Sequence, residues 1–77
     1  KMKLSIYGSG CAKCQALAKN AEAAAQALDL DYEIEKVTDT NQIIDAGIMR
    51  TPALMADDDI LVEGKVATPD EIRQMLS

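Results

Sequence analysis

The chain has 77 residues, of which 48 % are hydrophobic, a formal net charge of −5 and no His, Trp or Phe. This length supports one domain over residues 1–77, and the acidic balance argues against a nucleic acid or an anionic membrane as partner. The lack of His excludes Ser-His-Asp catalysis and His-based metal sites.

The first part of the chain predicts a strand, a glycine-rich turn and a long helix. Residues 3–7 have the pattern of a short strand that turns Leu4 and Ile6 toward one face, and residues 8–10 (Gly-Ser-Gly) form the turn. Residues 12–28 follow helical spacing with many alanines, which have high helix propensity. The predicted apolar stripe of this helix consists of Cys14, Leu17, Ala18, Ala21, Ala24, Ala25 and Leu28.

The middle of the chain predicts a second strand and a short helix. Residues 32–37 predict a strand whose first four residues alternate, and the two charged residues on the outer side indicate an edge strand or a strand with a solvated face. We expect Thr38 or Asp39 to cap a helix that ends near Ala46, with Gly47 as its C-terminal cap. The residues expected to face inward are Tyr32 and Ile34 from the strand, and Ile43 and Ile44 from the helix.

The last part predicts a hairpin and a final helix. Residues 53–56 and 60–62 are apolar segments joined by the acidic turn 57–59. The segment 68–71 (Thr-Pro-Asp-Glu) has the pattern of a capping box with Pro at the first helical position. The apolar face of this helix is expected to consist of Ile72, Met75 and Leu76.

The predicted order of elements is β-α-β-α-β-β-α. The first β-α-β unit needs a right-handed crossover and makes a parallel strand pair, whereas the hairpin is antiparallel. We therefore expect an α/β fold with a mixed four-stranded sheet and helices on both of its faces.

Cys11-Ala12-Lys13-Cys14 carries the strongest chemical signal, because it places the only two cysteines at the junction of a strand and a helix. Unpaired N–H groups and the helix dipole favour a thiolate there, and a C-x-x-C motif at such a junction is typical of a redox-active pair. Sparse cysteine use also indicates the cytoplasm. Two purely structural thiols are the simpler alternative, although burial accounts for Cys14 and not for Cys11 in its glycine-rich turn.

The C-x-x-C motif after the first strand, together with Thr51-Pro52 before the third, resembles the thioredoxin and glutaredoxin superfamily in its minimal form. The chain is most similar to small archaeal and bacterial thioredoxin-like redox-active disulfide proteins. The resemblance implies that Cys11 is the attacking cysteine and Cys14 the resolving one. It also implies that Pro52 is a cis-proline which, with Thr51 and Gly64, binds the substrate.

The resemblance implies a thiol-disulfide oxidoreductase that exchanges its dithiol with partner proteins and acts as a monomer. No cofactor is expected beyond the redox-active disulfide Cys11–Cys14, and a reductase protein is a more suitable electron donor than glutathione. Ala12 and Lys13 are expected to tune the thiol pKa. The chain departs from typical thioredoxins at Gly10, where they have Trp. The nearest residue to their buried acid is Ser5.

A soft-metal module is the main alternative function. Some copper chaperones carry M-x-C-x-x-C after their first strand, and two thiolates suit Cu(I). Ser9 stands here in place of that Met, and the chain ends on a capped helix rather than a strand. Thr51-Pro52 has its own alternative, an ordinary turn that leads into an edge strand.

Overall fold

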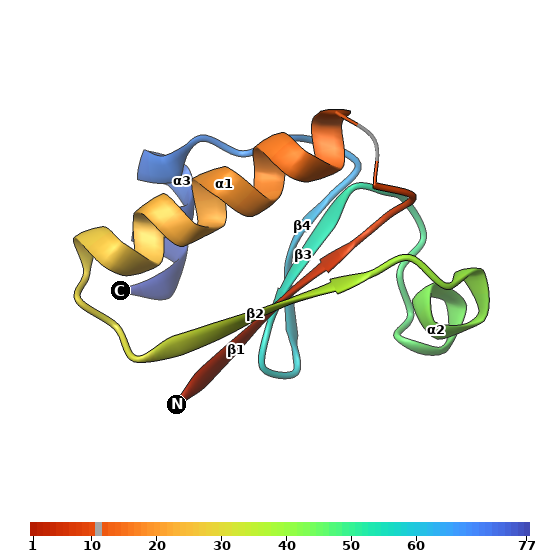
Figure 1. The fold of residues 1–77 in the computed structure, drawn as a ribbon, viewed down its shortest axis with the longest axis horizontal. Coiled ribbons are helices and arrows are strands. Elements are labelled where there is room, and N and C mark those ends of the chain that lie inside the picture. Colours follow the sequence, from red (N-terminus) through yellow and green to blue (C-terminus); the bar gives the residue numbers. More distant parts are fainter. Residues whose placement is uncertain (11) are drawn as a thin grey trace.

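The elements follow the predicted order in the computed structural model, which describes residues 1–10 and 12–77 (Figure 1). The predicted boundaries differ from the observed ones by at most about two residues. The elements are β1 (Met2–Tyr7), α1 (Ala12–Ala27), β2 (Tyr32–Val37), α2 (Thr40–Asp45), β3 (Ala53–Ala56), β4 (Asp59–Glu63) and α3 (Pro69–Leu76). No helix in the described part of the chain is long and apolar enough to cross a membrane.

The strands form one mixed sheet in the order β2-β1-β3-β4. β1 pairs in parallel with β2, so that Ile6 lies beside Lys36, and antiparallel with β3, so that Ile6 lies beside Leu54. The hairpin of β3 and β4 is antiparallel, with an irregularity between Leu54 and Met55. The sheet confirms the predicted α/β class and the predicted edge position of β2.

The main core lies between the sheet and the pair α1 and α3, which lie together on one face (Figure 1). Alternate residues of β1 and β3 point into it, as the twofold periodicity of a strand requires. α1 contributes the predicted alanine-rich stripe, whose small side chains let the helix lie close to the strands. The largest fully buried side chains are Leu4, Leu17, Leu54 and Ile72.

The opposite face of the sheet is covered only near α2. Ile43 and Ala46 pack there against a second buried cluster, and helices therefore occupy both faces as predicted. The buried members of this cluster are Tyr7, Val37, Ile48 and Ala53. On β1 and β2 this face also carries an ion pair between Lys3 and Glu35 at 2.6 Å, which is consistent with a solvated surface.

Two predicted inward positions are wrong. Ile44 is 63 % exposed because successive helical residues differ by about 100° in direction, and Ile43 already occupies the inward side of the short α2. Met75 is 40 % exposed, whereas Ile72 is fully buried and Leu76 packs against the core. Met75 lies in the last turn of α3, and the core side of the helix is occupied by Ile72 and Leu76.

Both short helices have defined caps. The Asp39 carboxylate accepts a hydrogen bond from the Gln42 backbone N–H at 3.1 Å, which selects Asp39 over Thr38 as the cap of α2. At α3 the predicted capping box is confirmed: the Thr68 hydroxyl accepts from the Glu71 N–H at 3.1 Å, and the Glu71 carboxylate accepts from the Thr68 N–H at 3.0 Å. These bonds satisfy N–H groups that a helix terminus leaves without partners.

The burial pattern predicts unequal costs for two truncations. Leu17→Ala should lower the free energy of unfolding by about 2–5 kcal/mol, because it opens a cavity in the core. Ile44→Ala removes a mostly exposed side chain and should change it by less than about 0.5 kcal/mol. Urea titration of both variants measures the difference. A loss of several kcal/mol for Ile44→Ala would contradict its outward position.

The capping box of α3 predicts that the stability of the fold depends on pH. Hydrogen bonds from Thr68 and the charge of Lys65 lower the pKa of Glu71, so its stabilising contribution is present at neutral pH and is lost as the pH falls through the folded-state pKa. Glu71→Gln keeps the side-chain shape but removes this titration. The loss of stability between pH 7 and pH 2 should therefore be smaller in Glu71→Gln than in the wild type, as measured by thermal unfolding. An identical loss would exclude the linkage.

Candidate active site

The sulfur of Cys14 lies where the first turn of α1 meets the carboxyl end of β1. Cys14 is the third residue of α1 and is only 5 % exposed, as expected for a member of the apolar stripe. Its neighbours along the helix stripe, Leu17 and Ala18, are buried in the main core. The other predicted cysteine, Cys11, lies outside the described residues.

Gly8 brings Cys14 close to the loop that contains Thr51. A Cβ atom placed on Gly8 would lie less than 3.0 Å from the Cys14 sulfur and 3.7 Å from the Thr51 Cβ. The Cys14 and Thr51 side chains therefore both lie near the place that a side chain of residue 8 would occupy. The structure thus brings together two of the predicted site residues that are 37 positions apart in sequence.

Pro52 and Gly64 are also adjacent. The Gly64 N–H donates a hydrogen bond to the Pro52 carbonyl at 2.9 Å, and the Thr51–Pro52 peptide bond is cis. Pro52 is buried, whereas Thr51 and Gly64 are exposed. The side chain of Arg50 packs on Gly64, where an added Cβ would lie 3.1 Å from two of its carbon atoms. The predicted substrate-binding residues therefore form one partly exposed surface.

The spacer residues Ala12 and Lys13 begin α1 and are both exposed. They are not among the residues that line the pocket beside Cys14. Lys65 contacts Glu71 at 3.4 Å, and its charge is therefore partly compensated within the chain.

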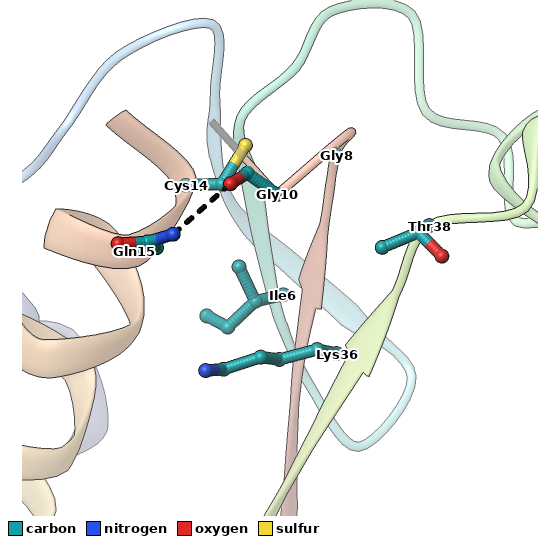
Figure 2. A pocket seen from close by; sticks show the side chains of 7 residues that line it. All are labelled: Ile6, Gly8, Gly10, Cys14, Gln15, Lys36 and Thr38. Carbon is teal, nitrogen blue, oxygen red and sulfur yellow. Dashed lines mark hydrogen bonds between the residues drawn. The ribbon is translucent and has the colours of Figure 1, made fainter. Parts of the chain in front are cut away.

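A pocket opens beside Cys14 between β1, β2 and α1 (Figure 2). The Gln15 side chain closes part of its rim by donating a hydrogen bond to the Gly10 carbonyl at 3.1 Å. The Lys36 side chain extends across the pocket below Ile6, and Lys36 forms no ion pair among the described residues (Figure 2). The lining residues are Ile6, Gly8, Gly10, Cys14, Gln15, Lys36 and Thr38.

Lys36 was not singled out by the sequence analysis, although the signal was present. Tyr32, Ile34 and Lys36 alternate along β2 and therefore share one face of the sheet. The parallel register sets Lys36 beside Ile6, directly under the start of α1. The alternation along β2 therefore places Lys36 on the face that α1 covers, and the strand register brings it to the pocket beside Cys14.

This arrangement suits sulfur chemistry. A buried sulfur near the N-terminus of a helix is close to backbone N–H groups that favour negative charge, and the Lys36 ammonium lies on the same pocket. Within residues 1–10 and 12–77 no three His, Cys, Asp or Glu side chains gather as a metal site would require. A soft metal bound at the C-x-x-C motif would therefore have two thiolate ligands from this chain, Cys11 and Cys14.

Known proteins match nearly the whole chain. Residues 2–77 match the family model described as a thioredoxin domain. A protein named thioredoxin from Methanothermobacter thermautotrophicus is 45 % identical over 76 residues, which cover 99 % of each chain. A thioredoxin from Methanocaldococcus jannaschii is 40 % identical over 73 residues, covering 95 % of this chain and 84 % of its own.

The position of Lys36 predicts charge selectivity toward small disulfides. Lys36→Gln should slow reaction of the reduced chain with the dianionic 5,5′-dithiobis(2-nitrobenzoate) by about 2- to 5-fold, the effect of one solvent-screened charge. Reaction with the dicationic disulfide cystamine should not slow. Lys19→Gln, which removes an exposed lysine of α1 that does not line the pocket, is the control. Equal slowing of both reagents by Lys36→Gln would contradict the prediction.

Proposed function

The chain belongs to the thioredoxin family, and on this premise we propose that it is a dithiol-disulfide oxidoreductase acting on partner proteins through Cys11 and Cys14. One observation supports this most directly. The Cys14 sulfur is buried at the start of α1 and contacts the end of β1 beside the Thr51–Pro52 loop. A resolving thiol needs such a sheltered position close to the place where a partner binds.

The proposed reaction has two exchange steps. The Cys11 thiolate attacks one sulfur of a partner disulfide, so that a mixed disulfide forms and the other partner sulfur leaves with the electron pair and takes up a proton. The Cys14 thiolate then attacks the Cys11 sulfur. The Cys11–Cys14 bond forms, and the second partner sulfur leaves as a thiol. Two electrons have then passed from the chain to the partner, and no bound cofactor takes part.

Thr51, Pro52 and Gly64 form the proposed partner-binding surface. Thr51 is exposed next to Cys14, and the bond from the Gly64 N–H to the Pro52 carbonyl holds the two loops side by side. An extended segment of a partner can pair with exposed backbone at this position, as in strand addition. Gly64 takes a φ of +72°, and the Arg50 side chain fills the space that its Cβ would need.

The remaining parts of the proposal concern the cellular setting. The chain acts as a monomeric domain in the cytoplasm and receives electrons from a reductase protein rather than from glutathione. Ala12 and Lys13 set the reduction potential together with the helix N-terminus. A measured potential of about −270 mV would indicate a reductant, and one of about −120 mV an oxidant.

Insulin reduction by dithiothreitol tests the proposal. The wild type should accelerate it, whereas Cys11→Ser should give the rate of dithiothreitol alone, because it removes the attacking sulfur. After removal of dithiothreitol, reduced Cys14→Ser should still attack insulin and accumulate a mixed disulfide that mass spectrometry detects, since the resolving sulfur is missing. Equal insulin reduction by wild type and Cys11→Ser would refute the redox role. Anaerobic titration with Cu(I) would then test the soft-metal alternative.

A further inference from the structure

We propose that Gly8 is a positioning residue for the second exchange step, because its missing side chain provides the space in which the Cys14 sulfur lies. This inference rests on the proposed function and extends it to a residue outside the C-x-x-C motif and the Thr51–Pro52 loop. A side chain at position 8 should displace the sulfur and slow resolution, while leaving the attack by Cys11 nearly unchanged.

The four glycines of the chain differ in what surrounds them. A Cβ on Gly8 would meet the Cys14 sulfur at less than 3.0 Å and the Cys14 Cβ at 3.5 Å. At Gly10 and Gly47 no heavy atom of the described residues lies within 4 Å of such a Cβ, apart from the glycine and its chain neighbours, although both have φ values of +81°. Gly8 itself has φ +157°. At Gly8 a side chain is therefore excluded by two things, the backbone conformation and the nearby Cys14 sulfur.

The backbone on either side of this contact is firmly held. Gly8 follows directly after β1, and its N–H donates a hydrogen bond to the Val37 carbonyl at 3.0 Å. Cys14 belongs to α1, whose following residues Leu17 and Ala18 are buried in the main core. Neither segment can move away without disturbing the core. An added methyl group at position 8 must therefore be accommodated mainly by the Cys14 side chain.

A cysteine in a helix has few ways to accommodate that group. Its χ1 angle is confined to a small number of staggered rotamers, and intermediate angles cost free energy. Disulfide formation in turn requires a narrow range of dihedral angles and separations. A displaced Cys14 sulfur is consequently less able to attack Cys11 in the mixed disulfide. The first step uses the Cys11 sulfur and does not need Cys14 in place.

Two-phase kinetics separate the steps. Reduced protein mixed with 5,5′-dithiobis(2-nitrobenzoate) releases one thionitrobenzoate when Cys11 attacks and a second when Cys14 closes the ring. Stopped-flow absorbance records both. In Gly8→Ala the first phase should stay within about twofold of wild type, and the second should be about 3- to 10-fold slower, the penalty of an off-rotamer side chain. Biphasic release by the wild type checks the proposed function independently.

Gly10→Ala is the matched control, since it introduces the same methyl group at positive φ in the same loop but into open space. Its second phase should stay close to that of the wild type. If Gly10→Ala slows the second phase as much as Gly8→Ala, loop strain is the cause and the proposal fails. Unchanged phases in Gly8→Ala would also overturn it.

A stability cycle tests the contact even if Gly8→Ala folds poorly. Gly8→Ala is introduced into the reduced wild type and into Cys14→Ala, and urea unfolding gives its cost in each background. The cost should be clearly smaller with Ala at position 14, where the clashing sulfur is gone and the ordinary contacts to the Cβ atoms of residue 14 at 3.5 Å and Thr51 at 3.7 Å remain. The same cost in both backgrounds would show that Gly8 does not act through the sulfur.

Discussion

The close approach of α1 to the end of β1 is the constraint on which the rest of the structure depends. At this point a helix residue, Cys14, and a strand terminus, Gly8, leave no room for another carbon atom. The approach is possible because the buried stripe of α1 consists largely of alanines, whose small side chains allow a short distance between the helix and the sheet. The larger volume required by a close-packed core comes instead from Leu4, Leu54 and Ile72. The packing of α1 against the sheet thus also determines where the Cys14 sulfur lies.

The same arrangement links the three segments of the candidate site. β1 occupies an interior position in the sheet, between β2 and β3, so that its carboxyl end is flanked by both neighbours. β2 brings Lys36 to the pocket from one side, and the loop before β3 brings Thr51 and Pro52 from the other. Gly64 joins from the end of β4 through its bond to Pro52. Sheet order therefore determines which distant residues meet at the first turn of α1.

Much of this fold could be predicted because its signals are local. The stripe of α1, the alternation in β2 and the capping box at Thr68 each depend on residues only a few positions apart. The two wrong predictions concern burial, which depends on how one helix packs against the rest of the chain. Ile44 follows an inward residue on a helix of only six residues, and Met75 precedes Leu76, which packs against the core. The alternation in β2 gives the face on which Lys36 lies, but its place in the pocket beside Cys14 and the contact of Gly8 also depend on strand register and helix approach, which no local pattern contains. The sequence singles out the C-x-x-C motif and Thr51-Pro52 as candidates, whereas Lys36 and Gly8 are found from the structure.

Charge is distributed unevenly over this acidic chain. Lys1, Lys3 and Lys65 each pair with a glutamate on exposed surfaces, where such pairs contribute little to stability. Lys13, Lys36 and Arg50 form no ion pair among the described residues, and each lies next to a residue of the candidate site. Since Coulomb interactions in water decay within about 10 Å at moderate salt, a thiolate responds to these nearby cations more than to the net charge of −5. An acidic protein can therefore keep a locally positive environment for sulfur: three of its lysines pair with glutamates, whereas Lys13, Lys36 and Arg50 near the candidate site, like Lys19 on the exposed side of α1, form no ion pair among the described residues.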